Sequence, residues 1–231
     1  ASDVRPGPLL AAEKNIRKAG LEGKIRTVLA DGIPLNIGEI LLDLSGSEAA
    51  GSNTDPCAGV HGKFDSGKEA EDGQESGKIP VSPEQLPAAA CVITGMGGML
   101  ITRILGKAGH CLEFFDILIL SPQSEPDKVR NCLADLHFRI SQERMVKEDG
   151  KYYTMLLCER GTGEALSKKE ALYGPRLLEK RDPVLYEYLL KQRAALSEIR
   201  NELRIHGKDG STRYTEVNEL LEVTDEALRD Y

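Results

Sequence analysis

The residues whose types and spacing could support chemistry form a glycine-rich turn, Gly95, Met96, Gly97 and Gly98. They follow a short apolar run with β-branched residues and precede an apolar pattern of helical period, which is typical of a buried strand that turns into a helix. Glycine permits a positive φ and lets the backbone lie directly against a ligand. Amides at the start of the next helix can also face a polar group. The turn is therefore predicted to be a ligand site at the edge of an α/β sheet.

The elements that would position this turn alternate between strands and helices. The run 115–120 is almost continuously apolar, which indicates a strand buried on both faces of a parallel sheet. A helix is expected at 125–136. Strands at 138–146 and 152–158 flank the sequence Glu-Asp-Gly-Lys at 148–151, and this short loop predicts an antiparallel hairpin.

The beginning of the chain fits the same alternation. Residues 1–4 have the pattern of the tail of a strand, 9–19 that of a helix, and 25–29 that of a second strand, which ends before Asp31 and Gly32. Because the chain starts inside a strand and its first residue is not methionine, we expect it to be truncated at its N-terminus.

Beyond residue 161 the pattern becomes helical. Two apolar series step by three and four residues and are separated by a turn at 206–211, which predicts a helical hairpin in the form of a short antiparallel coiled coil. We therefore expect a partial α/β domain at 1–161 and a C-terminal helical coiled-coil domain at 162–231. The two series are Leu189, Gln192, Leu196, Ile199 and Leu203, then Val217, Leu221, Thr224 and Leu228.

The composition is that of a globular protein, with 40% hydrophobic and 29% charged residues in 231. No apolar run approaches the roughly 20 residues of a membrane span, and no secretory leader is evident, so a cytoplasmic monomer that does not enter membranes is expected. The five cysteines and four histidines are scattered, which argues against a metal site or a disulfide framework. Cys91 and Cys158 lie in strand-like runs and are expected to be small buried apolar side chains.

Most of the negative charge lies in one segment. Residues 44–87 contain eight acidic and three basic residues, a net of −5, so that the rest of the chain carries only −2 of the total of −7. The segment has almost no large apolar side chains, which predicts a disordered insert. A nucleic-acid partner is therefore compatible with the overall acidity.

Taken in order, the predicted elements resemble the Rossmann-like sheet of class I S-adenosylmethionine-dependent methyltransferases. Three blocks and the final hairpin are similar, more narrowly, to the bacterial tRNA (adenine-22-N1)-methyltransferase family. This resemblance implies S-adenosyl-L-methionine as the methyl donor and N1 of an adenine in tRNA, at position 22, as the acceptor. The blocks are Ile-Thr-Gly-Met-Gly-Gly at 93–98, Leu-Ile-Leu-Ser-Pro-Gln-Ser-Glu-Pro at 118–126 with Val129 and Arg130, and Glu-Asp-Gly-Lys-Tyr-Tyr at 148–153.

The resemblance also assigns roles to the donor-binding residues. Asp3 would hold the ribose hydroxyls of the donor, Asp31 and Gly32 would meet its adenine ring, and the turn from Gly95 to Gly98 would place the transferring methyl beside the target base. Each has a simpler interpretation. Asp3 and Asp31 could be ordinary turn residues, and the glycines could be needed only for a tight turn.

For the tRNA, the resemblance points to Tyr152 and Tyr153 as walls around a flipped base and to the hairpin as a grip on the RNA backbone. The tyrosines could equally be packing residues, and the cations could be a solvated helix face. The candidate cations are Arg176, Lys180, Arg181, Arg193 and Arg200.

One element of the family is absent from the sequence: the first strand and its glycine-containing loop, which would hold much of the donor. A noncatalytic RNA- or protein-binding module on a degenerate methyltransferase fold is therefore the alternative. A nicotinamide dehydrogenase is disfavoured because no Gly-x-Gly-x-x-Gly follows a first strand.

The acidic insert provides a first test of the methyltransferase hypothesis. If it is a tolerated insertion, deleting residues 46–87 leaves methyl transfer largely intact, as measured with labelled donor and tRNA. A complete loss of transfer in a deletion variant with unchanged circular dichroism and melting temperature would contradict this expectation.

Overall fold

The computed structural model describes residues 2–3, 6–22, 25, 27–30, 32–33, 37, 41, 89–163 and 165–231. The predicted insert and Asp31 lie outside these residues. Among the helices described, none is long and apolar enough to cross a membrane.

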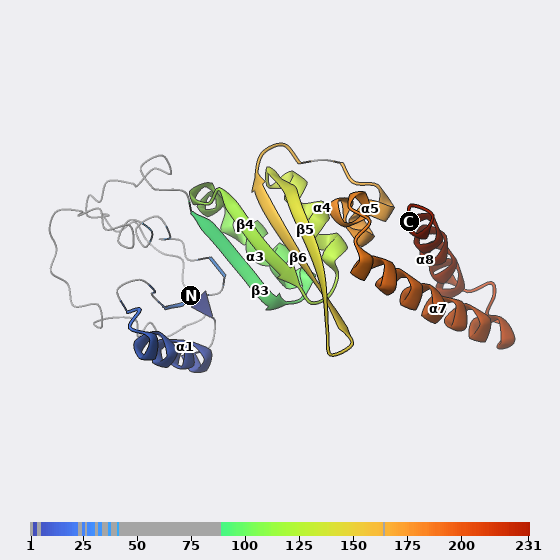
Figure 1. Cartoon of the computed structure of the whole chain (residues 1–231), viewed down its shortest axis with the longest axis horizontal. Helices are drawn as coiled ribbons and strands as arrows, with labels where there is room; N and C mark the ends of the chain where they lie inside the picture. Colours follow the sequence, from blue (N-terminus) through green and yellow to red (C-terminus); the bar gives the residue numbers. More distant parts are fainter. Residues whose placement is uncertain are drawn as a thin grey trace, which may run out of the picture.

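A four-stranded mixed sheet forms the centre of the molecule (Figure 1). Its strands are β3 (Ala90–Met96), β4 (Ile117–Pro122), β5 (Phe138–Glu148) and β6 (Lys151–Arg160), in the order β3-β4-β6-β5. β3 and β4 are parallel, whereas β6 is antiparallel to both β4 and β5. The predicted α/β class is confirmed.

Helices α3 (Gly98–Ala108) and α4 (Pro126–Asp135) pack on one face of this sheet, and a 3-10 helix, η2 (Gly109–Phe114), follows α3. The core contains Ile101 and Leu105 of α3, Leu133 of α4 and Leu118 of β4, all at most 1% exposed. Cys158 is also fully buried in this core, as predicted, and burial raises the pKa of its thiol to about 12.

Cys91 is only half-buried at the start of the sheet, so it is less enclosed than the sequence predicts. Burial nevertheless raises the pKa of its thiol to about 11. At neutral pH both thiols are therefore protonated and poorly nucleophilic.

The predicted hairpin between β5 and β6 is confirmed and is longer than its sequence pattern indicates. Its two central turn residues, Asp149 and Gly150, have φ values of 48° and 74°. Two successive positive φ values are typical of a type I′ turn, whose twist matches the right-handed twist of the flanking strands. β6 pairs with β4 only from Leu156 to Glu159, whereas it pairs with β5 from its first residue, Lys151. The tip of the hairpin therefore extends past the end of β4.

At the N-terminus, β1 (Ser2–Asp3) and β2 (Val28–Leu29) form a separate parallel pair joined through α1 (Pro6–Ala19). This agrees with the predicted order of strand, helix and strand. Ile33, Ile37 and Leu41, which follow β2, pack against the hydrophobic core of the four-stranded sheet.

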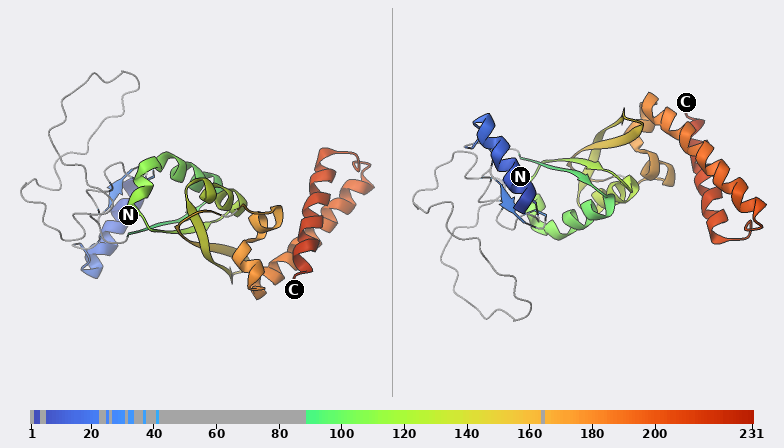
Figure 2. Two further views of the ribbon diagram at one scale, coloured as in Figure 1. Left: turned by 90° about the horizontal axis from the view of Figure 1, so that it is seen from above. Right: turned by 90° about the horizontal axis from the view of Figure 1, so that it is seen from below.

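The C-terminal part consists of α5 (Lys168–Tyr173), α6 (Pro175–Glu179), α7 (Pro183–Ile205) and α8 (Thr212–Leu228). α7 and α8 lie side by side as a helical hairpin that projects away from the sheet (Figures 1 and 2). Asp182 caps α7 and Ser211 caps α8 through side-chain oxygens that accept amide hydrogens. The coiled-coil form of this hairpin and the domain boundary at residue 161 stay predictions.

A buried ion pair joins the sheet to these helices. Arg130 of α4 donates from Nε to Glu143 Oε1 of β5 at 2.8 Å, and its Nη1 donates to the carbonyl oxygens of Ala171 and Leu172. The other carboxylate oxygen of Glu143 accepts the amide hydrogen of Arg176 at 3.0 Å. Both charged side chains are at most 1% exposed. The pair thus links α4, β5, α5 and α6.

Removing one partner of this pair should destabilise the fold strongly, because the remaining charge would stay buried without compensation. Arg130→Met is expected to lower the free energy of unfolding by about 3–5 kcal/mol, measured by urea denaturation. The double variant Arg130→Met/Glu143→Leu is expected to recover much of this loss. Equal stability of Arg130→Met and the wild type would contradict the role assigned to the pair.

Candidate active site

The predicted ligand turn lies at the carboxyl edge of β3, where the strand departs from regular pairing. Thr94 pairs with Ser121 and Met96 pairs with Pro122, so Gly95 is the extra residue of a bulge. Gly95 has a φ of 75°, is exposed, and has no atom within 4 Å of the position that a Cβ would take. Its backbone therefore faces open space at the edge of the sheet.

The next two glycines lie against the turn that follows β4. The Gly98 amide donates to the Ser124 carbonyl oxygen, and the Gln123 amide donates to the Met96 carbonyl oxygen, each at 2.8 Å. A Cβ at Gly98 would lie 2.2 Å from the Glu125 carbonyl oxygen. At Gly97, which caps α3, it would lie 2.9 Å from Ser124 Oγ. Gly98 is thus required for packing of backbone on backbone.

The four turn residues consequently have different surroundings. Gly95 is open to solvent, Met96 and Gly97 are half-buried, and Gly98 is buried. The interpretation of the glycines as a folding requirement applies to Gly98, whereas packing does not explain the absence of a side chain at Gly95. Its positive φ favours glycine, yet the space beside it is available to a ligand.

The predicted donor-binding residues are only partly brought together. Gly32 has a φ of 103°, and a Cβ there would lie 3.2 Å from Ile104 Cγ2, so this residue packs on α3. Asp3 pairs through its backbone with Leu29 in the separate two-stranded sheet. Asp31 lies outside the described residues.

Of the two tyrosines proposed as walls for the base, Tyr152 contacts the C-terminal helices. Its hydroxyl donates to Glu187 Oε1 at 3.1 Å, and its ring meets Tyr188 edge-on with centroids 5.2 Å apart. Tyr153 is half-buried and pairs with Val146. Because consecutive strand residues face opposite sides, the two tyrosines do not line one surface.

The five predicted RNA-binding cations also differ. Arg176 donates from Nε to the Ile140 carbonyl oxygen at 3.0 Å, and Arg193 donates to Asp225 Oδ1 of α8 at 2.7 Å. Lys180 and Arg181 are exposed between α6 and α7, and Arg200 is half-buried on α7. Intramolecular bonds thus occupy two of the five.

Sequence reasoning missed three residues that organise this region. Glu143 and Glu187 lack a local signal, because their partners are 13 and 40 residues away in the chain. Ser124 lies in the block that follows β4, and its approach to Gly97 could be anticipated only from the meeting of two neighbouring turns at one sheet edge.

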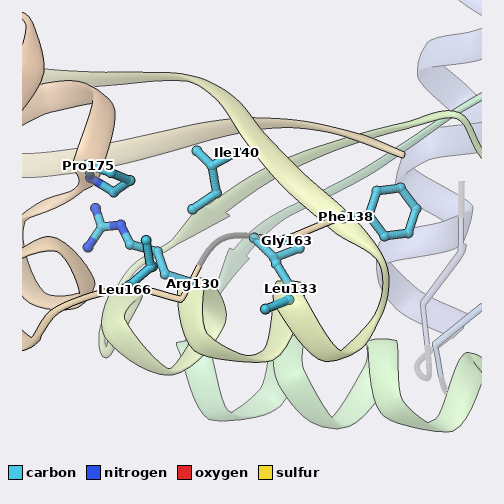
Figure 3. Close-up of a pocket in the computed structure, with 8 residues that line it drawn as sticks. Arg130, Leu133, Phe138, Ile140, Gly163, Leu166 and Pro175 are labelled. Atoms are coloured by element: carbon cyan, nitrogen blue, oxygen red, sulfur yellow. The ribbon is translucent and has the colours of Figure 1, made fainter. Parts of the chain in front are cut away.

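A small enclosed cavity lies elsewhere, between α4, β5 and the start of α6 (Figure 3). Its volume of about 10 Å³ is of the order of a single water molecule, so it does not accommodate a methyl donor. No group of three or more acidic, histidine or cysteine side chains in the described part of the chain could hold a metal ion. The open turn at Gly95 is the better candidate for ligand chemistry.

Comparison with known proteins identifies the family. Residues 74–226, which include the glycine turn, the hairpin and most of the C-terminal helices, match the sequence model of TrmK, tRNA (adenine(22)-N(1))-methyltransferase. The chain belongs to this family. A Bacillus subtilis tRNA (adenine(22)-N(1))-methyltransferase is 26% identical over 165 residues, which are 71% of this chain and 50% of the relative.

Solved structures confirm the fold. A Streptococcus pneumoniae protein in complex with S-adenosyl-L-methionine superimposes with a TM-score of 0.67 at 25% identity, over 99% of this chain and 79% of the other. TrmK from M. capricolum, in complex with S-adenosyl-homocysteine, gives 0.69 at 19% identity, over 100% of this chain and 80% of the other. The chain spans about half the length of the curated relatives it matches.

The contacts of the glycine turn lead to a prediction about stability. Gly98→Ala should destabilise the TrmK-family fold by several kcal/mol, because its Cβ would overlap the Glu125 carbonyl group and neither backbone segment can move alone. Gly97→Ala should cost less, since the Ser124 side chain can rotate. Thermal denaturation of the two variants provides the measurement, and a Gly98→Ala protein with the wild-type melting temperature would contradict the packing role.

Proposed function

We propose that the whole protein transfers a methyl group from S-adenosyl-L-methionine to N1 of an adenine in tRNA, at position 22. The observation that carries this proposal is the family match over residues 74–226, which contains the open turn at the carboxyl edge of β3. The donor bound to the S. pneumoniae relative and the name of the B. subtilis relative support the same assignment.

The chemistry suits a site made mainly of backbone. When bound, S-adenosyl-L-methionine supplies an electrophilic methyl group on a sulfonium. Adenine N1 already has a lone pair in the plane of the base, so a strong general base is not required. The protein then contributes orientation and acceptors for the positive charge that develops on the base. The carbonyl group of Gly95 is best suited to this role, because the bulge exposes the backbone there. The Met96 and Gly97 carbonyl oxygens already accept amide hydrogens within the protein.

The donor would bridge the separate two-stranded sheet and the carboxyl edge of β3. In the proposal Asp3 holds the ribose hydroxyls, Asp31 and Gly32 border the adenine, and Gly95 lies nearest the reacting methyl. The open space beside Gly95 fits this arrangement, since a side chain there would occupy the volume that the donor and base need.

For the tRNA, the exposed cations Lys180 and Arg181 at the base of the helical hairpin are the best placed to contact phosphates, with Arg200 farther along α7. Arg176 and Arg193 would have to exchange an intramolecular partner for the RNA. Tyr153 is retained as a candidate wall for the base. The protein would act as a cytoplasmic monomer.

The decisive measurement is methyl transfer from labelled donor to unmodified tRNA by the whole protein. Transfer to tRNA with adenine at position 22, its absence with guanine there, and N1-methyladenosine in the digested product are the expected results. A well-folded whole protein that binds tRNA and transfers no methyl would favour the noncatalytic module.

Placement of the site is tested by Gly95→Asn. Asparagine tolerates a positive φ better than other side chains, so the fold should persist while the new amide fills the space beside the turn. Transfer is expected to fall on the order of a hundredfold, equivalent to about 2.7 kcal/mol in the barrier.

The matched control is Gly20→Asn. Gly20 follows α1, has a φ of 65° and also has open space around it. The same substitution there should leave transfer unchanged. Undiminished transfer in a folded Gly95→Asn protein would reject this placement of the site.

A further inference from the structure

The hairpin tip and the first turns of α7 are joined by a cluster of side chains centred on Tyr152. Besides the hydroxyl bond to Glu187 and the edge contact with Tyr188, the ring lies within reach of two ammonium groups, with Lys191 Nζ at 5.4 Å and Lys147 Nζ at 5.8 Å from its centroid. Lys147 also forms an ion pair with Glu187. Three residues of α7 thus converge on two residues of the hairpin.

The ionisation of this cluster is stable at neutral pH. The bonds from Lys147 and Tyr152 lower the pKa of Glu187, and the bond to Glu187 raises the pKa of Lys147. Glu187 therefore stays charged down to a pH below its ordinary range, and Lys147 stays charged up to a pH above its own. Both partners of the ion pair are charged at neutral pH.

Because the cluster lies at the start of α7, a small rotation there would move the far end of the helical hairpin by several ångströms. α7 has 23 residues, and at about 1.5 Å per residue it extends roughly 35 Å from its start near the β5–β6 hairpin. A rotation of about 10° at that start would displace the far end by roughly 6 Å over this helical length. Cations such as Arg200 would then lose their register with an RNA held at the glycine turn.

The contacts of this cluster are too weak to decide whether the chain folds, so their effect on the direction of α7 can be tested in a folded protein. Lys147 and Glu187 are 41% and 50% exposed, so their ion pair contributes little to global stability. Beside them, Met145 of β5 packs with Leu185 and Leu189 of α7 in a buried apolar cluster, and Tyr152 packs only against the outside of this cluster. Loss of the Tyr152 contacts should thus loosen α7 without unfolding the chain.

We propose that Tyr152, Lys147 and Glu187 form a latch between the β5–β6 hairpin and α7, and that Tyr152 is a positioning residue that sets the affinity for tRNA by holding the helical hairpin relative to the glycine turn. This inference rests on the proposed function, because an RNA-binding arm requires a tRNA substrate. It assigns Tyr152 to the orientation of that arm instead of to the wall of the base pocket.

Steady-state kinetics with separate titration of the two substrates provide the first test. Tyr152→Ala is expected to raise the KM for tRNA on the order of tenfold, as loss of about 1.4 kcal/mol of arm positioning would do. The KM for S-adenosyl-L-methionine and kcat should change by less than about twofold, a free-energy change below roughly 0.4 kcal/mol. Tyr152→Phe keeps the ring contacts and should recover most of the effect.

Two further variants test whether the residues act as one unit. Glu187→Ala removes the acceptor of both Lys147 and the Tyr152 hydroxyl and should raise the KM for tRNA. The double variant Tyr152→Phe/Glu187→Ala should be no more impaired than Glu187→Ala, because the single change already removes the bond to the hydroxyl. The matched control is Glu148→Ala, a change of the same kind at an exposed position of the same hairpin, which should have no effect. A fall in kcat at constant KM would overturn the proposal and place Tyr152 at the reacting base.

A readout that does not depend on activity is available because the sequence of 231 residues has no tryptophan. Ile205 is 79% exposed at the far end of α7, so Ile205→Trp introduces a single tryptophan there, which can be excited separately from the tyrosines. Time-resolved anisotropy should show a larger nanosecond amplitude when Tyr152→Ala is added. An unchanged decay would refute the latch. If the whole protein transfers no methyl, the proposed function fails, and the anisotropy still decides whether the latch exists.

Discussion

The arrangement of this protein depends on one buried ion pair, Arg130 with Glu143. Neither charge can be left without a partner in the core, because the free-energy cost of burying an unpaired ion exceeds the stabilisation that most single contacts provide. Arg130 Nη1 donates to the Ala171 and Leu172 carbonyl oxygens, and Glu143 accepts the Arg176 amide hydrogen. The charges can therefore be compensated only when α5 and α6 lie against α4 and β5. Gly174 completes the constraint, since a Cβ there would lie 2.6 Å from the carboxylate.

Beyond the buried ion pair, two sets of contacts of unequal strength hold α7. The buried pair determines where α5 and α6 lie, and the apolar cluster around Leu185 and Leu189 fastens the start of α7. In the proposed latch, the weaker contacts of the half-buried Tyr152 adjust the direction of α7. The base of the helical hairpin is thus fixed by a buried ion pair and an apolar cluster, whereas its direction depends on weak contacts near the surface.

Much of the fold could be predicted from the sequence because its signals are local. The apolar run into glycines at 91–98 gave a strand, a bulged turn and a helix, and Asp149-Gly150 gave a tight hairpin through two positive φ values. The candidate site was predicted less completely, since its organisation depends on partners distant in sequence. Tyr152 has the residue type of a base-stacking wall, and only the position of α7 reveals that it packs on a helix. Arg176, similarly, looks like a free cation until β5 is placed beside it.

The glycines at the end of β3 show how one sequence pattern can satisfy two requirements. Gly98 has no side chain because the turn after β4 fills that space, and this contact brings the ends of β3 and β4 into register. Gly95 has no such neighbour, and its bulge directs backbone outward at the same edge. A site built in this way takes its geometry from the sheet instead of from side-chain rotamers. Because a backbone carbonyl group fixed between paired strand residues cannot reorient when positive charge develops nearby, it would provide the fixed electrostatic environment that the proposed transfer to a neutral ring nitrogen needs.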